Sequence, residues 1–90
     1  MIAPGHTPGL QVTAVQTAKG KAIVGSDLAH TFFSYETDIP SAYIFDMVSW
    51  VKSYDKVRAE AASADLLFPG HDIQLMEKFP KVTEDITRLA

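Results

Sequence analysis

The chain contains no cysteine, which excludes disulfide bonds and thiolate metal ligands. Because disulfides are rare in the cytoplasm, this absence favours a cytoplasmic location. The sequence also lacks the stretch of about 20 apolar residues that a membrane span needs, and the basic-then-apolar start of a signal peptide. Basic residues are few, 8 against 11 acidic ones, and they do not cluster. The net charge of −3 therefore predicts neither nucleic acid nor membrane as a partner.

The length of 90 residues allows one small domain, and the hydrophobic content of 47% is ordinary for a globular chain. A domain of this size buries only roughly 60–65% of its unfolded surface, so its stability on its own is marginal. No internal repeat, low-complexity segment or linker divides residues 1–90. We interpret them as one unit.

The alternation of strand-like and helix-like segments predicts a layered α/β fold, with a β-hairpin first, then a helix and short strands. Residues 10–17 and 22–24 have strand patterns, and Gly20 between them serves the turn of the hairpin. The aromatic-rich segment 30–43 is expected to be irregular, since Pro40 prevents a continuous helix.

The second part of the chain has a helical period. From residue 41 or 44 to residue 62, the residues of one helix face recur at three- and four-residue intervals. They are Ile44, Val48, Val51, Tyr54 or Asp55, and then Val57, Arg58 and Ala61. The opposite, solvated face carries Lys52, Lys56 and Glu60. Beyond this helix we expect a short buried strand over residues 65–68, one or two helical turns over 73–78 and a terminal strand over 82–89.

Three glycine-bounded loops beside apolar runs carry metal-ligand side chains: His6 in PGHTPG, Asp27 in GSD and His71 in FPGHD. Imidazole nitrogen and carboxylate oxygen suit zinc, and loops at strand ends bring together residues that are distant in sequence. Glycine beside each of them lets the backbone turn sharply and approach an ion. The pattern predicts a metal site formed by His6, Asp27 and His71.

Each signal also has a plainer interpretation. A loop histidine is more often a surface or hydrogen-bonded residue than a ligand, and Pro-Gly is an ordinary turn sequence. Asp27, just before Leu28, has the position of a helix or turn cap. Thr7 and Asp72 lie beside the ligands, where they either orient them through hydrogen bonds or cap the backbone. The occurrence of all three stretches in this order favours the metal site.

In this order the stretches GHTPG, SD and GHD resemble the third metal motif, the bridging aspartate and the last histidine motif of the metallo-β-lactamase-fold hydrolases. Within that superfamily, SDLAH and PGHDI are most similar to the quorum-quenching N-acyl homoserine lactonase branch. The resemblance implies the C-terminal half of the αββα sandwich. The upstream His-x-His-x-Asp-His motif of the family, with the half that carries it, is absent from this sequence.

The resemblance further implies zinc as the cofactor, with two ions in the complete enzyme. It assigns His6 to the first metal and His71 to the second, each together with ligands from the absent half. Asp27 is the expected bridge, since a carboxylate between two cations offsets their repulsion. The implied reaction is the opening of a lactone ring by a metal-bound hydroxide. Because most of the ligands are absent, we expect the isolated chain to be inactive.

His30 departs from the family pattern, which commonly has a tyrosine three residues after the bridging aspartate. An imidazolium can stabilise an oxyanion or protonate a leaving oxygen near neutral pH, so His30 joins Asp27 as a catalytic candidate. A half-exposed loop histidine is the alternative. Phe32, Phe33 and Tyr35 are the candidates for binding the acyl chain or ring of a substrate, and simple packing is their alternative.

Two classes of function follow. The first is a hydrolase whose complete form acts on an N-acyl homoserine lactone, or on another small lactone or ester. The second is a noncatalytic module that associates with itself or with the missing N-terminal half, because half of such a fold leaves apolar sheet surface exposed. Glyoxalase-II-like thioesterases and other hydrolases of the superfamily share the same ligand order, so fold alone does not decide between them.

Overall fold

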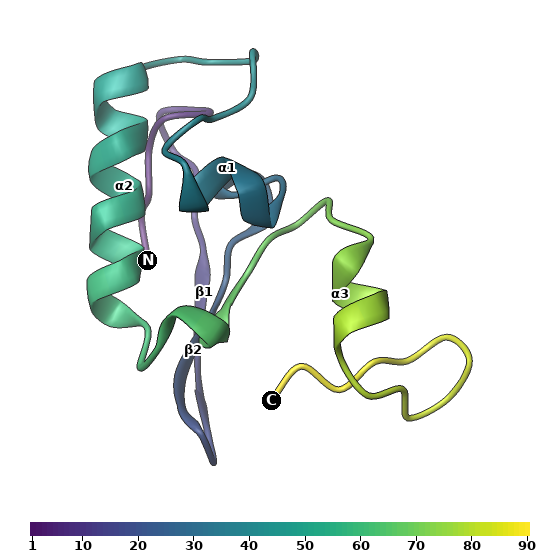
Figure 1. The fold of residues 1–90 in the computed structure, drawn as a ribbon. Helices are drawn as coiled ribbons and strands as arrows, with labels where there is room; N and C mark the ends of the chain where they lie inside the picture. Colours follow the sequence, from purple (N-terminus) through teal and green to yellow (C-terminus); the bar gives the residue numbers. More distant parts are fainter.

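A computed structural model describes residues 1–90 (Figure 1). Its three-stranded sheet has the order β1-β2-β3, in which β1 (Thr13–Thr17) and β2 (Gly20–Val24) are antiparallel and β3 (Leu67–Phe68) runs parallel to β2. The mixed α/β class predicted from the sequence is confirmed. The helical elements are η1 (Ser26–Leu28), α1 (Phe32–Glu36), α2 (Met47–Glu60), η2 (Ala64–Leu66) and α3 (Gln74–Lys78).

The hairpin forms around Gly20, as predicted. Gly20 has a φ of +111°, which a side chain would disfavour, and the Thr17 hydroxyl donates to its carbonyl at 2.7 Å. The first strand begins at Thr13, three residues later than expected. The reason is that the preceding residues pair with the N-terminus instead, through an isolated bridge between Ile2 and Gln11.

Helix α2 begins at Met47, later than residue 41 or 44, because Asp46 caps it. The Asp46 carboxylate accepts hydrogen bonds from the Val48 amide at 3.1 Å and from the Ser49 hydroxyl at 2.6 Å. The helix ends when Ala61 turns to extended backbone. Its 14 residues make it the longest helix, and no helix combines the length and the apolar character of a membrane span.

The predicted apolar face of α2 is only partly right, since Tyr54 and Val57 are buried as expected but Ile44 and Val48 are exposed. Val48 is 63% exposed, whereas the aromatic rings of Trp50 and Tyr54 and the side chain of Val57 are fully buried. Large aromatic side chains bury more area than β-branched ones, so they determine which face packs inward. The solvated face was predicted correctly, since Lys52, Lys56 and Glu60 are all exposed.

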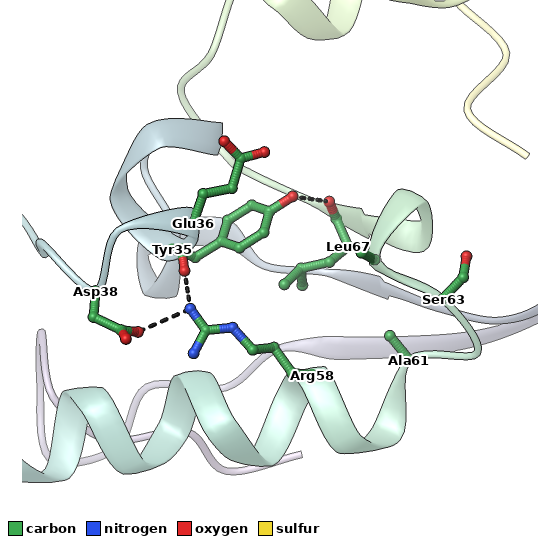
Figure 2. A pocket seen from close by; sticks show the side chains of 8 residues that line it. Tyr35, Glu36, Asp38, Arg58, Ala61, Ser63 and Leu67 are labelled. Atoms are coloured by element: carbon green, nitrogen blue, oxygen red, sulfur yellow. Dashed lines mark hydrogen bonds and ion pairs between the residues drawn. The ribbon is translucent and has the colours of Figure 1, made fainter.

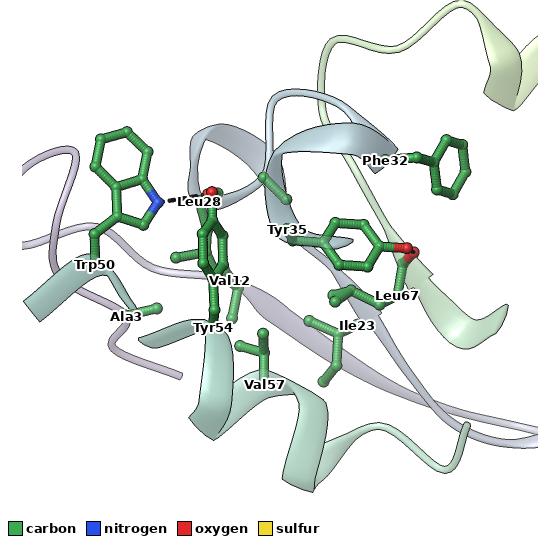
Figure 3. Close-up of a cluster of buried hydrophobic side chains, with 11 residues drawn as sticks. Ala3, Val12, Ile23, Leu28, Phe32, Tyr35, Trp50, Tyr54, Val57 and Leu67 are labelled. Atoms are coloured by element: carbon green, nitrogen blue, oxygen red, sulfur yellow. Dashed lines mark hydrogen bonds between the residues drawn. The ribbon is translucent and has the colours of Figure 1, made fainter. Parts of the chain in front are cut away.

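The main core lies between α2 and one face of the sheet (Figure 3). Because side chains alternate along a strand, Ile23 points into this core while Ala22 points to the other face. On that second face Ala22, Leu66 and Phe68 pack with Leu75 and Phe79, which come from α3 and from the residue after it. The sheet therefore carries helices on both faces, which is the layered arrangement expected.

The remaining segments differ partly from the prediction. Segment 30–43, expected to be irregular, contains α1, whose start is fixed by a reciprocal capping box between Thr31 and Ser34. Of residues 65–68 only Leu67–Phe68 is strand, and 73–78 forms the short helix α3 as expected. The terminal strand over 82–89 is wrong. Only an isolated bridge between Lys81 and Thr87 forms there, because that segment closes on itself in a tight loop.

Candidate metal centre

Parallel pairing of β2 with β3 brings the segments after both strands to one edge of the sheet. The register places Val24 opposite Phe68, so both strands end at the same level. Backbone hydrogen bonds continue beyond the strands, from the Gly70 amide to the Ala29 carbonyl at 2.8 Å and from the His71 amide to the His30 carbonyl at 2.9 Å. Residues 41 positions apart in sequence are thereby fixed side by side.

Gly70 makes this close approach possible. A Cβ atom at this position would lie 2.6 Å from the backbone oxygen of Ser26, closer than real side chains come to a carbonyl. Ser26 itself has a φ of +47°, an uncommon value for a residue with a side chain. The glycine predicted beside the last histidine therefore has a steric function, because it lets the His71 loop contact the Asp27 turn.

Asp27, His30 and His71 form one cluster. Each offers a ligand atom that lies within 4.8 Å of the other two. His71 Nε2 donates to Asp27 Oδ1 at 2.6 Å, and His30 Nε2 lies 4.0 Å from the same oxygen. The imidazole rings of His30 and His71 are stacked, with their centroids 5.0 Å apart. The predicted Asp27 and His71 are thus adjacent, and His30 is part of the same group.

His6 lies on the other side of His30. The centroids of their rings are 5.3 Å apart, and His6 is not within the group of three ligand atoms. Its Nδ1 donates to the Tyr43 carbonyl at 2.8 Å. A backbone carbonyl on Nδ1 fixes the tautomer in which Nε2 carries the lone pair, and this is the usual arrangement of a metal-binding histidine.

The charges of the cluster act on one another. The hydrogen bond from His71 is the main cause that holds the pKa of the Asp27 carboxyl below its ordinary value of 3.8, and the nearby imidazoles of His30 and His6 add to this effect. Burial, and then the neighbouring His71, lower the pKa of His30 from its ordinary 6.5. Asp27 is therefore an anion and His30 a neutral imidazole at pH 7, which are the forms that bind metal.

Trp50 contacts both the turn that carries Asp27 and the ring of His6, and no sequence pattern indicated this role. The buried indole Nε1 donates to the Leu28 carbonyl at 2.7 Å, one residue after Asp27. The indole ring also lies 5.4 Å from the ring of His6. A Cβ at Gly5 would come within 2.4 Å of Trp50, so the glycine before His6 allows that loop to lie against α2.

Thr7 and Asp72 were predicted either to orient the ligands or to cap the backbone. The Asp72 carboxylate accepts from the Phe32 amide at 2.9 Å and from the Gln74 amide at 2.9 Å, so it ties the starts of α1 and α3 together. These are backbone-capping bonds. Thr7 is exposed and its hydroxyl forms no hydrogen bond within the chain.

The aromatic residues predicted to bind substrate lie elsewhere. Phe32 and Tyr35 are buried in the main core, and the Tyr35 hydroxyl donates to the Leu67 carbonyl at 3.2 Å. Tyr35 borders a pocket of about 410 Å³ beside Arg58, none of whose lining residues belongs to the histidine cluster (Figure 2). Phe33 is 61% exposed. Packing, the alternative left open by the sequence, describes Phe32 and Tyr35.

A different set of apolar side chains lies beside His6. Tyr43, Ile44 and Phe45 line an open depression of about 390 Å³ together with His6 and Thr7. The Phe45 and Asp46 amides both donate to the Gly5 carbonyl, at 2.9 and 3.0 Å, and hold this segment against the His6 loop. No sequence pattern indicated that these residues lie beside His6, because this proximity depends on contacts between segments about 40 residues apart in the chain.

The cluster is chemically suited to a divalent cation. His71 Nε2 and Asp27 Oδ1 share a short hydrogen bond of 2.6 Å, whose proton a cation can replace. His30 Nδ1 is buried without any hydrogen-bond partner. Two imidazoles and one carboxylate with partly exposed side chains match the three-ligand zinc sites of enzymes, which keep a fourth position open.

No protein-family model matches the sequence, and neither does any curated protein. Solved structures do match. A structure of N-acyl homoserine lactone hydrolase with the product N-hexanoyl-L-homoserine at the catalytic metal centre has a TM-score of 0.71 and 26% identity, over 89% of this chain and 32% of its own. A B. thuringiensis AiiA mutant with N-decanoyl-L-homoserine at its active site gives a TM-score of 0.72, with 26% identity over 89% and 32% of the two chains.

AidC, a dizinc quorum-quenching lactonase in complex with a product, is 28% identical with a TM-score of 0.61, over 81% of this chain and 26% of its own. The chain thus spans between a quarter and a third of the length of these lactonases, so their activity is not carried over with the fold. Over the part that it spans, the chain has the metallo-β-lactamase fold and is similar to the N-acyl homoserine lactonases, as its sequence motifs indicated.

Proposed function

We propose that this chain is the C-terminal part of a zinc-dependent hydrolase that opens a lactone ring. An N-acyl homoserine lactone is the favoured substrate, followed by another small lactone or ester. One observation carries the proposal: Asp27, His30 and His71 meet within 4.8 Å at the ends of β2 and β3, in a fold similar to that of lactonases. A cytoplasmic location, supported by the absence of cysteine, belongs to the same proposal.

In the complete enzyme His6, Asp27 and His71 would hold zinc together with ligands from a His-x-His-x-Asp-His motif that this chain does not contain. Bound zinc would supply water activated at neutral pH and would polarise the carbonyl of the substrate. Asp27 would contribute a negative charge to the metal site. His30, beside Asp27, is placed to take a proton from the attacking water as a neutral base and to return it to the oxygen that leaves when the ring opens.

The apolar part of the substrate has a candidate surface in the depression lined by Tyr43, Ile44 and Phe45 beside His6. Tyr43 is 81% exposed and Phe45 64% exposed, so both are free to contact a ligand. An acyl chain lying there would place its lactone carbonyl near the histidine cluster. We therefore propose these residues in place of Phe32 and Tyr35 for substrate binding.

A noncatalytic role is the second candidate, and the same exposed side chains favour it. Phe33, Phe45 and Val48 are each more than 60% exposed, an unusual arrangement for large apolar residues of a small domain. Covering them, by a second copy or by the missing part of the fold, would stabilise the chain. In this case the isolated chain associates without hydrolysing anything.

A chimaera tests the proposed function, with this chain in place of the matching third of a solved N-acyl homoserine lactonase. We expect the zinc-loaded chimaera to open N-hexanoyl homoserine lactone, measured by the acid released, and Asp27→Ala to abolish the activity. The isolated chain is expected to be inactive. Asp65→Asn is the matched control, since Asp65 is an exposed acidic residue outside the cluster.

The outcomes separate the candidates. Hydrolysis of a thioester but not of a lactone would favour a glyoxalase-II-like parent. A folded, zinc-loaded chimaera without activity on either substrate would contradict the hydrolase proposal. Concentration-dependent association of the 90-residue chain, measured by sedimentation, together with such inactivity would favour the noncatalytic role.

A further inference from the structure

The side chain of His30 has no hydrogen bond in the structure. Its Nδ1 is buried without a partner, and its Nε2 lies 4.0 Å from Asp27 Oδ1, beyond hydrogen-bonding distance. Its side chain is only 24% exposed, so water does not fully replace these bonds. A half-buried imidazole without partners is costly, since an unmade hydrogen bond costs about 1–3 kcal/mol. A structural role as a hydrogen-bonded loop histidine therefore does not explain it.

We propose that this chain on its own binds one divalent cation through Asp27, His30 and His71, with His30 as a true metal ligand. The position carries tyrosine in the lactonase pattern, so the ligand set is a property of this sequence. The proposal depends on the metal-binding part of the proposed function and is independent of its lactone chemistry. When the complete enzyme supplies the other ligands, His30 is released for the proton transfer described above.

The distances suit a single ion. Zinc lies about 2.0–2.2 Å from nitrogen and oxygen ligands, so two ligands of one ion are at most about 4.4 Å apart. Asp27 Oδ1 lies 2.6 Å from His71 Nε2 and 4.0 Å from His30 Nε2, and all three ligand atoms fit within 4.8 Å. The contact of 2.6 Å is shorter, and the limit of 4.8 Å longer, than the usual separation of two ligands on one zinc ion, so rotation of the side chains would accompany binding.

The backbone holds these side chains together before any ion binds. The His71 amide donates to the His30 carbonyl at 2.9 Å, so the two ligands are directly linked. Asp27 precedes His30 by three residues in the turn that Trp50 anchors through the Leu28 carbonyl at 2.7 Å. A site already in place loses little conformational freedom on binding, which favours affinity.

Charge also favours the cation. Asp27 supplies one negative charge, and the imidazoles supply lone pairs without a further charge. The chain as a whole has a net charge of −3. The side chain of His71 is 58% exposed and that of Asp27 39% exposed, so an ion can enter from solvent and keep a water molecule in the fourth position. His6 is not needed, since it lies outside the group of three ligand atoms.

Zinc titration of the full 90-residue chain by calorimetry tests the proposal. We expect one ion per chain. His30→Gln, which keeps the approximate size, should weaken zinc binding at least tenfold, because even residues that merely orient a ligand are worth about 10–100-fold. His30→Asp, which restores a ligand atom, should recover part of the affinity. Asp65→Asn, at an exposed acidic residue outside the cluster, is the matched control and should change the affinity less than threefold.

Nitrogen NMR of the imidazole rings provides a second measurement, because the chain has only 3 histidines. Added zinc should shift one ring nitrogen of His30 and one of His71, and leave His6 unchanged. Circular dichroism establishes that each variant remains folded. Wild-type affinity in folded His30→Gln, or zinc shifts at His6 and His71 without His30, would overturn the proposal. So would the absence of zinc binding, whatever the lactonase chimaera does.

Discussion

Replacement of Trp50 by Phe tests how the fold supports the site. The indole is fully buried and its Nε1 donates to the Leu28 carbonyl at 2.7 Å, next to Asp27. Phenylalanine keeps an apolar ring in the core but cannot donate a hydrogen bond. The Leu28 carbonyl therefore loses its indole partner, and a small cavity remains where the larger ring was.

The expected loss of stability follows from these two effects. An unpaired buried carbonyl costs about 1–3 kcal/mol. The cavity adds about 1 kcal/mol. A total of about 2–4 kcal/mol is a large part of the roughly 5–15 kcal/mol that stabilises a small domain. In a chain of this size it lowers the melting temperature by roughly 10–30 °C. Zinc affinity should fall as well, because the turn that carries Asp27 loses its anchor.

Tyr54→Phe is the matched control, one helical turn from Trp50 in the same core. The Tyr54 hydroxyl is buried near Ser34 and Trp50 but has no hydrogen bond of acceptable geometry. Its removal leaves no partner unpaired, so stability should be unchanged or higher. Far-UV circular dichroism follows both unfolding transitions, since Trp50 is the only tryptophan and its fluorescence disappears with it. Equal losses of stability in Trp50→Phe and Tyr54→Phe would refute the reasoning. They would show that any change to a core aromatic ring destabilises the chain, with no special part for the indole hydrogen bond.

Three further predictions concern other contacts. Gly70→Ala should weaken zinc binding, measured by calorimetry, because its Cβ would lie 2.6 Å from a backbone oxygen. Gly9→Ala is the control and should leave zinc binding unchanged, because a Cβ there meets no atom within 4 Å. Tyr35→Phe should destabilise the chain by about 1 kcal/mol in urea unfolding. Burial raises the pKa of Tyr35 from 10 to about 12, so this tyrosine ionises at a lower pH in the unfolded chain than in the folded one. The stability of the wild type therefore falls as pH rises through this range. Tyr35→Phe should lack this contribution to the pH dependence. Glu60→Gln should lower the melting temperature slightly at low salt and not at high salt, because the Lys21–Glu60 pair, at 2.6 Å, is exposed. The hydrogen bond from Lys21 lowers the pKa of Glu60 below 4.5, so the contribution of the pair is present above pH 4.5 and is lost as pH falls through the lowered pKa.

The sequence was informative wherever a local rule applied. Gly20 predicted the hairpin turn, and the apolar runs before GSD and FPGHD predicted two strands that end beside Asp27 and His71. Parallel pairing of those strands then brings Asp27 and His71 to one edge. These features depend on a few neighbouring residues, so a single sequence contains them.

Features that depend on distant contacts could not be predicted. The role of Trp50 comes from a hydrogen bond to a backbone carbonyl 22 residues away, for which no side-chain pattern exists. Val48 has a helical spacing typical of a core residue, yet the aromatic rings of Trp50 and Tyr54 occupy the core instead. Segment 82–89 has apolar residues suited to a strand but finds no strand to pair with.

Folding and the proposed metal binding depend on the same contacts in this chain. Strand β3 contributes only two residues to the sheet, so the loop bonds from Gly70 to Ala29 and from His71 to His30 carry much of the pairing between the two ends of the chain. Those bonds are also the ones that hold the cluster of Asp27, His30 and His71 together. An ion that binds only the folded cluster stabilises the folded state, by about 2.7 kcal/mol when its concentration is about 100 times its dissociation constant. For a small domain of marginal stability this is a substantial share, so the proposed ion would help to keep the two ligand loops side by side.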